Sequence, residues 1–269
     1  MGEAMSAFKP GSPFPTPLAD PSLPTMYDLP SENPEEPGLP DQFHDWQPQL
    51  LSQTFKPKTV PIDQVLTAAD LNIYYDSATT RYYKRPDWFA AVGVPRFVEG
   101  GRLSYVRWQE GRSPLVVVEL LSPNTIEEDQ GLTLRGQQPP SKWEVYEQIL
   151  QVPYYVLFNR VDDTLQIFRL EDGFYQEQAE SRLWIAELQI GLGLWRGRFA
   201  DWERQWLRWY DSEGQWIPTE QEKRIQEQQR AELERQRADL AEQRAREAEQ
   251  RTQALIERLK AAGIDPESM

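Results

Sequence analysis

Two residue types that carry much enzyme chemistry are nearly absent from this chain. Among its 269 residues there is no cysteine, and His44 is the only histidine. The first absence excludes disulfides, thiolate zinc sites and cysteine nucleophiles. The second argues against a Ser-His-Asp triad or a histidine-rich metal site. The catalytic chemistry that remains is that of carboxylates, lysines and hydroxyls.

Long hydrophobic runs and a surplus of positive charge are also missing. No run of roughly 18 apolar residues occurs, and no basic segment followed by an apolar one opens the sequence. We therefore expect a soluble, cytoplasmic protein with no membrane partner. The 43 acidic residues outnumber 29 basic ones, which gives a formal net charge of −14. This balance disfavours nonspecific binding to nucleic acid unless a local basic surface or metal ions offset it.

Composition divides the chain into three regions. Proline is concentrated early, with 13 of the 22 prolines in residues 1–61, and such a segment cannot hold a regular helix or a central strand. We expect an extended, partly disordered arm over residues 1–40, with order beginning near Tyr27. A folded domain is expected over residues 41–210, followed by a linker and a long charged helix over residues 211–269.

The middle region has the pattern of an α/β (α+β) domain. β-Branched and aromatic residues gather in short runs, which indicate strands. Residues 141–151 predict a helix, with Ser141 as the N-cap and Glu144 completing a capping box. The order strand, helix, strand predicts a crossover within a central mixed sheet flanked by helices. The expected strands are 71–75, 87–94, 102–108, 114–121, 154–158 and 164–169, and a short helix is expected over 47–55.

Six of the ten tryptophans lie in residues 183–218. The favoured interpretation is that they pack a peripheral layer of the domain, because large aromatic rings bury much apolar area. A platform on which nucleic-acid bases stack is the alternative.

Residues 219–262 lack proline and glycine and are rich in Glu, Gln, Arg and Ala, which predicts a long helix that ends at Gly263. Small and aliphatic residues recur every seven positions, as in the seam of a coiled coil. Because alanine buries little area, we expect either a weak coiled coil or a solvated single helix supported by i,i+4 charge pairs. The seam consists of Ala231, Ala238, Ala245, Thr252 and Leu259, with Ala241, Ala248, Leu255 and Ala262 at the complementary position.

Two acidic residues stand in the most apolar runs of the middle region. Glu119 lies within PLVVVELL, which is apolar at nearly every other position, and Asp87 opens DWFAAVGV. A run of this kind indicates a strand covered on both faces. Two buried carboxylates side by side repel each other unless a divalent cation lies between them. Oxygen ligands without histidine or cysteine suit Mg²⁺ or Mn²⁺, so the sequence predicts a metal site at Asp87 and Glu119.

Hydrolysis of a phosphodiester also needs a cation that orients the attacking water or stabilises developing charge. Lys142, near the start of the expected helix, can point over the sheet toward Glu119, and Tyr146 shares its helical face. Asp129 is a candidate for an additional metal ligand or for a residue that contacts and positions the ligands. The charge run at residues 127–129 is, however, typical of a solvated loop.

Each candidate also has a structural interpretation, and these alternatives stay open. Asp87 can cap a turn, and Glu119 can form a buried ion pair with Arg85 or Arg107. A lysine near a helix start, such as Lys142, is commonly solvated. The remaining polar residues near the site are read as a turn for Ser122 and Asn124, with phosphate binding as the alternative, and as a structural role for His44.

Several motifs occur in a characteristic order: RPDWFAAVGVP, VVVELLSPNT with Asp129, and KWEVYEQILQVPYYVLFNR followed by TLQIFRL and FYQE. Taken together, they resemble the Uma-two family of the PD-(D/E)XK, or restriction-endonuclease-like, superfamily. The resemblance covers about residues 27–210, and the tail also looks like that of many members.

The resemblance implies a central mixed sheet flanked by helices and metal-dependent cleavage of nucleic acid. Asp87 matches the acid of the PD element, and Glu119 matches the acid of the (D/E)XK element. Leu121 stands where the superfamily has its lysine. Lys142 matches the lysine on the next helix that is thought to take over this role in the family.

Two hypotheses follow. The first is an endodeoxyribonuclease dependent on Mg²⁺ or Mn²⁺, in which Asp87 and Glu119 hold the metal and Lys142 acts on the nucleophile or the developing charge. The second is an inactive, nuclease-like protein that uses its C-terminal helix to bind a partner or a second copy. Leu121 and the acidic balance favour the second hypothesis. DNA is the expected partner, a homodimer stays open, and the sequence does not reveal specificity for strand, base sequence, or DNA over RNA.

Overall fold

The computed structural model describes residues 22–25, 28, 42–121, 129–132 and 139–261. The chain forms two compact units, residues 1–217 and residues 218–269, which are described separately. Most of the expected proline-rich arm over residues 1–40, and the expected start of order at Tyr27, lie outside the described residues.

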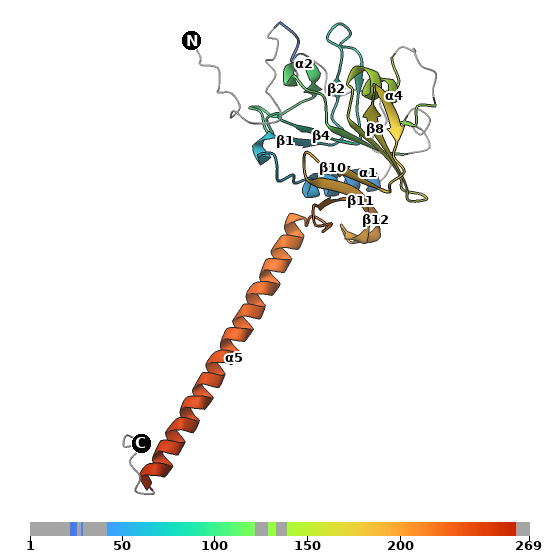
Figure 1. The fold of residues 1–269 in the computed structure, drawn as a ribbon. Coiled ribbons are helices and arrows are strands. Elements are labelled where there is room, and N and C mark those ends of the chain that lie inside the picture. The colour runs from blue at the N-terminus through green and yellow to red at the C-terminus, as the bar shows by residue number, and fades with distance from the viewer. Residues whose placement is uncertain (1–21, 26–27, 29–41, 122–128, 133–138, 262–269) are drawn as a thin grey trace, which may run out of the picture. The chain divides into compact units, whose positions relative to one another are not determined.

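A six-stranded mixed sheet forms the centre of the first unit (Figure 1). Its spatial order is β1-β4-β6-β7-β8-β9, and only the central pair β6 and β7 runs parallel. A parallel pair needs a crossover connection, whereas an antiparallel pair can be joined by a short turn, as β7, β8 and β9 are. The strands are β1 (Val65–Ala68), β4 (Trp88–Val92), β6 (Val116–Leu120), β7 (Tyr154–Asn159), β8 (Thr164–Glu171) and β9 (Phe174–Glu177).

The crossover between β6 and β7 contains the expected helix, in an altered form. It starts as α4 (Lys142–Glu144), capped by the Ser141 hydroxyl, which accepts a hydrogen bond from the Glu144 amide at 3.2 Å. It continues as a π-helical turn, Val145–Ile149, in which the Leu150 amide donates to the Val145 carbonyl at 2.8 Å. The prediction of a regular helix over residues 141–151 is therefore wrong in its second half. Such π turns frequently occur at functional sites.

Apolar layers cover both faces of the central sheet, which confirms the predicted mixed sheet flanked by helices. Helix α1 (Gln42–Thr54) and a second sheet pack on one face, and the crossover packs on the other. Alternate residues of β6 divide between the two cores: Val116 and Val118 face α1, whereas Val117 faces the crossover. The second sheet has the order β10-β11-β12, from β10 (Arg182–Ile185), β11 (Ile190–Phe199) and β12 (Trp202–Asp211).

The second sheet corrects the interpretation of two of the six tryptophans, while Trp184 and Trp202 are exposed. Trp206 and Trp209 are fully buried and pack with Phe43, Phe55 and Trp88 in the main core, so they are not a peripheral layer. The hairpin that carries them was hard to foresee because its turn residues, Ala200 and Asp201, adopt positive φ angles of 48° and 62° without an Asn-Gly signal.

Two expected strands belong to a small third sheet of order β3-β2-β5 and are shorter than predicted. The run 71–75 yields only β2 (Ile73–Tyr74), which pairs with β3 (Tyr83–Lys84). The run 102–108 yields β5 (Tyr105–Val106) and then turns into helix α2 (Arg107–Glu110). Arg102 and Glu110, joined by an ion pair of 2.8 Å, hold this segment folded back on itself, which periodicity alone does not reveal.

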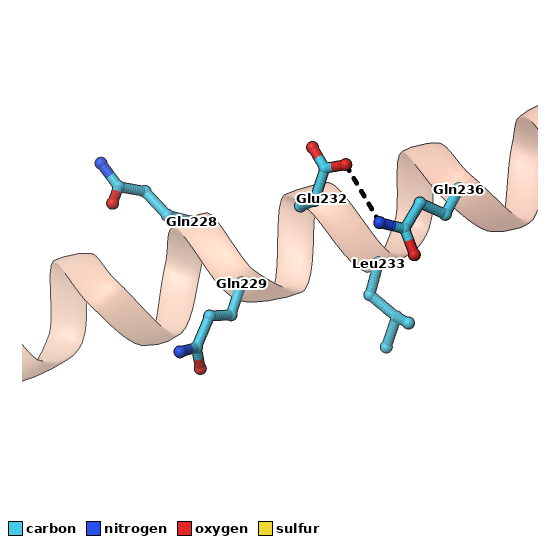
Figure 2. A pocket seen from close by; sticks show the side chains of 5 residues that line it. All are labelled: Gln228, Gln229, Glu232, Leu233 and Gln236. Atoms are coloured by element: carbon cyan, nitrogen blue, oxygen red, sulfur yellow. Dashed lines mark hydrogen bonds between the residues drawn. The ribbon is translucent and has the colours of Figure 1, made fainter.

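The second unit is the expected long helix, α5 (Glu220–Ala261), which has 42 residues. Its start carries a capping box, in which the Thr219 amide donates to Glu222 at 2.7 Å and the Glu222 amide donates to the Thr219 hydroxyl at 3.2 Å. Figure 2 shows one stretch of α5, where the Gln236 amide donates to Glu232 at 3.1 Å. Within the described residues, α5 and every other helix are too short or too polar to cross a bilayer.

Candidate active site

Glu119 lies on the face of β6 that carries the crossover, with Val117 on the same side. Its side chain has no exposed surface. Oε1 accepts a hydrogen bond from the Tyr146 hydroxyl at 2.8 Å. Oε2 accepts from Lys142 Nζ at 3.0 Å and from the Asp87 backbone amide at 3.3 Å. The cost of burying this carboxylate is therefore offset by one cation and two neutral donors.

Asp87 lies directly before β4 and beside Glu119. Strands β4 and β6 pair as far as Trp88 and Val118. Beyond this point, Asp87 Oδ2 accepts a hydrogen bond from the Leu120 amide at 2.6 Å. The half-buried Asp87 side chain thus adds one hydrogen bond between the two segments beyond their last backbone pair. The Asp87 backbone amide donates to Glu119. The two acids singled out in the sequence are brought together across neighbouring strands.

Lys142 joins a third carboxylate to this pair. Its ammonium lies 3.0 Å from Glu119 Oε2 and 3.1 Å from Oδ1 of Asp129, which is 1% exposed. The Tyr155 hydroxyl donates to the Asp129 carbonyl at 3.0 Å, which ties this segment to β7. Asp129 is therefore buried beside the lysine, and its reading as part of a solvated loop is wrong.

The electrostatics of the cluster follow from its burial. Burial lowers the pKa of Lys142, but the carboxylates of Glu119, Asp129 and Asp87 raise it more, so that it lies well above its usual range. Burial raises the pKa of Glu119, and Lys142 opposes this effect only in part. Burial and Glu119 together raise the pKa of Tyr146, which keeps that hydroxyl a hydrogen-bond donor.

The structure bears on the alternative interpretations of Glu119, Arg85 and Arg107. The buried ion pair of Glu119 forms with Lys142 rather than with Arg85 or Arg107, so that expectation is wrong in its partner. Arg85 instead donates to Asn72 at 2.9 Å. Ser122 and Asn124 lie outside the described residues.

His44 is buried on α1, and its Nε2 lies 3.0 Å from the Leu120 carbonyl. Both backbone groups of Leu120, the residue next to Glu119, therefore have side-chain partners: Asp87 for the amide and His44 for the carbonyl. Sequence reasoning missed this link because 76 positions separate the two residues. No local pattern signals such a contact.

The donor set fits a small divalent cation. Asp87 and Glu119 offer carboxylate oxygens, and Mg²⁺ typically takes one or two carboxylates together with water and substrate oxygens. The carboxylates of Glu119 and Asp129 contact one ammonium and that of Asp87 adds to the negative field on it, so a second cation would meet a negative potential if the acids are ionised. Within the described part of the chain, no group of three or more His, Asp or Glu side chains has an arrangement that could hold a metal ion. Any site here would therefore rest on the pair Asp87 and Glu119.

Comparison with known proteins agrees with the motifs. No curated protein matches the chain. A family model named Uma2, the Uma-two family of the motif resemblance, matches residues 22–198, which is well over half of the sequence. This family is described as "Putative restriction endonuclease", which supports a nuclease-like function. The match contains Asp87, Glu119, Asp129 and Lys142, and it shows that the chain belongs to the Uma2 family.

Proposed function

We propose that the chain is an endonuclease that hydrolyses DNA phosphodiester bonds with the help of Mg²⁺ or Mn²⁺. The observation that carries this proposal is the meeting of Asp87 and Glu119 across β4 and β6, with Lys142 Nζ 3.0 Å from Glu119. A buried carboxylate with a strongly shifted pKa, such as Glu119, is more common at functional sites than elsewhere in a fold. DNA as substrate and a cytoplasmic location are parts of the same proposal.

Lys142 can do the work of the lysine that is absent at position 121. Leu121 is buried in the apolar core on the crossover side of the sheet, so it offers no charge. Lys142 reaches the same carboxylate from the start of the crossover helix, and its raised pKa keeps it an ammonium at neutral pH. An ammonium in this place orients a water nucleophile or stabilises the charge that develops on the phosphate.

Asp87 and Glu119 would hold the metal in this proposal. A bound divalent cation supplies a Lewis acid and lowers the pKa of a water molecule. Glu119 is held in place by the Tyr146 hydroxyl, and Asp87 by the Leu120 amide. Both ligands are therefore positioned by neighbouring groups before any substrate binds, which reduces the reorganisation that catalysis requires.

Cleavage of supercoiled plasmid with Mg²⁺, with Mn²⁺ and with a chelator tests the proposal. We expect nicking that depends on the metal and that falls at least about 100-fold in Asp87→Asn, Glu119→Gln and Lys142→Met, because each change removes a charged group from the reacting centre. Glu110→Gln is the matched control, since Glu110 is also a buried carboxylate paired with a cation, Arg102, outside this cluster. Cleavage that persists in Asp87→Asn, or that disappears equally in Glu110→Gln, would contradict the assignment.

One observation favours the second candidate, an inactive nuclease-like protein. Both oxygens of Glu119 already accept hydrogen bonds, and Lys142 bridges two carboxylates as it would in a purely structural ion pair. Calorimetric titration with Mn²⁺ separates the two candidates. An active site predicts binding that is lost in Glu119→Gln, whereas a structural cluster predicts the same absence of binding in both proteins.

A further inference from the structure

Helix α5 carries a charge pattern that its own hydrogen bonds do not explain. It contains ten acidic and ten basic residues, so the helix as a whole is neutral. Five arginines recur at intervals of seven residues and form one exposed row along the helix. They are Arg230, Arg237, Arg244, Arg251 and Arg258.

The arginine row borders the heptad seam. With Ala231, Ala238 and Ala245 at position a of the heptad, the arginines occupy position g, immediately before a. The opposite border, position e, contains Glu242 and Glu249. Positions g and e are those whose side chains meet across a two-stranded coiled coil. The seam between them becomes more apolar toward its end, where Leu255 is 59% exposed.

Pairs four residues apart within α5 do not account for the central charges of this pattern. A solvated single helix is stabilised by opposite charges three or four residues apart, and Arg230 with Glu234 and Glu242 with Arg246 form pairs of the four-residue kind. The central charges have an opposite charge at the three-residue spacing only: Glu234 for Arg237, Glu247 for Arg244 and Arg246 for Glu249. At the four-residue spacing, Arg244 has Leu240 and Ala248.

Arg237 and Glu249 also lack an opposite charge four residues away. Arg237 has Leu233 and Ala241 four residues away, and Glu249 has Ala245 and Gln253. These charges occupy positions g and e, whose side chains contact a second helix in a coiled coil. A residue at g meets the residue at e that is five positions later in the sequence.

The orientation of a second helix follows from the sign of the charges. In a parallel pair, each g residue faces the e residue five positions later in the other chain, so Arg237 faces Glu242 and Arg244 faces Glu249. Each of these contacts occurs twice in a symmetric pair, whereas the single repulsive one, Arg230 with Arg235, lies near the start of α5. In an antiparallel pair, g faces g, and arginine would face arginine along the whole row.

From this complementarity we infer that α5 pairs in parallel and in register with α5 of a second copy of the chain. The contact is centred on the segment Ala238–Leu259, because the preceding seam positions hold the charged residues Glu227 and Glu234. Alanine in the seam lets the two backbones approach closely but buries little area, so the pair dissociates on dilution. Both copies of the first unit are attached at the same end of such a pair, whatever activity that unit has.

The absence of cysteine allows a direct test on the full chain. Ala241→Cys places one thiol at position d, where it faces its own copy only in a parallel, in-register pair; antiparallel pairing sets d against a. Gln243→Cys is the control, two residues away on the outer face of the helix. In a glutathione redox buffer we expect the Ala241→Cys chain to form the disulfide-linked dimer about 10-fold to 100-fold faster than the control, because paired thiols experience an effective concentration in the millimolar range. Equal rates would overturn the inference.

A charge exchange tests the basis of the pairing. In the Ala241→Cys chain, Glu249→Arg sets arginine against arginine and should slow cross-linking to the rate of the control. Adding Arg244→Glu restores opposite charges and should restore the faster rate. If the double exchange stays as slow as the single one, the charge complementarity proposed here is wrong. Circular dichroism of each variant shows that α5 is still helical.

Discussion

The carboxylate of Glu119 illustrates how single residues determine this site. It is completely buried, and its neighbours in β6 are all apolar. Three donors from two places compensate it: Lys142 and Tyr146 from the crossover, and the amide of Asp87 from the residue directly before β4. Each donor fixes the direction of one oxygen. The same contacts that make the residue tolerable in the core therefore also orient it.

The raised pKa of Glu119 gives a prediction for stability. Above the ordinary value of 4.5, the residue is ionised in the unfolded chain but stays protonated in the folded one up to its raised pKa, so the folded state binds the extra proton. Raising the pH through this window therefore favours unfolding. In Glu119→Gln this contribution is absent.

We expect the Glu119→Gln variant to become more stable relative to wild type as the pH rises from 4.5. The quantity to compare is the free energy of unfolding of each protein, measured by urea titration with a chelator present. The gain should approach about 1.4 kcal/mol per pH unit and level off above the folded pKa. A difference that stays constant with pH would show that Glu119 is ionised throughout and that Lys142 outweighs its burial.

At the scale of elements, one side chain of α1 makes both hydrogen bonds to the backbone of a residue in β12. Strand β12 is an edge of its sheet, and the backbone of Leu207 has no partner strand on the outer side. The buried amide of Gln47, on α1, donates to the Leu207 carbonyl at 2.9 Å and accepts from the Leu207 amide at 2.8 Å. The Gln47 side chain thus makes the two hydrogen bonds that a residue of a further strand would make to Leu207.

Gln47→Ala should therefore destabilise the first unit strongly. It leaves two buried backbone groups without a partner, each at a cost of about 1–3 kcal/mol, and the expected loss in the free energy of unfolding is about 2–5 kcal/mol. Gln49→Ala is the control, because Gln49 is an exposed glutamine of the same helix that binds only Asp45. Thermal or urea unfolding of both variants provides the measurement. Similar small losses in the two would contradict this role for Gln47.

The crossover shows a second effect at this scale. A regular helix would place Tyr146 and Lys142 four residues apart on one face, as the sequence indicates. The structure keeps the contact of Tyr146 with Glu119, but the turn that contains Tyr146 is widened to a π-helix, Val145–Ile149. Gln151, with a positive φ of 51°, then ends the segment before β7. The widened turn therefore includes Tyr146, one of the residues that donate to Glu119.

At the scale of the whole molecule, the two units differ in what stabilises them. The apolar cores of the first unit end at Ile217, whose amide donates to the Trp209 carbonyl at 2.9 Å and whose carbonyl accepts from buried Arg208. The hydrophobic core clusters of the described residues contain no residue of α5, and its Leu233, Leu240 and Leu255 are exposed. The first unit should therefore fold without the second.

We expect a chain that ends at Pro218 to unfold within about 2 °C of the full protein, since it keeps every residue of the apolar cores of the first unit. A chain that ends at Asp211 is the informative comparison. It lacks Ile217 and leaves Arg208 buried without this acceptor, so it should unfold at least about 5 °C lower. Scanning calorimetry measures both. If the two truncations unfold at the same temperature, Ile217 does not close the first unit.

The sequence by itself determined the elements whose signals are local. Unbroken apolar runs identified β4, β6 and β7, since a strand covered on both faces needs apolar residues at every position. The capping residue Ser141 marked the start of the crossover, and the absence of proline and glycine marked α5. Asp87 and Glu119 were recognisable because a carboxylate stands out in such runs.

Only the tertiary structure decided which residues meet. The bond of Gln47 to Leu207 spans 160 positions, and that of His44 to Leu120 spans 76. The second carboxylate of Lys142, Asp129, lies in a charged run that resembles a solvated loop. The reason is physical: hydrophobic periodicity reports the environment of a residue on its own element, whereas the partner of a buried polar group depends on how distant elements pack.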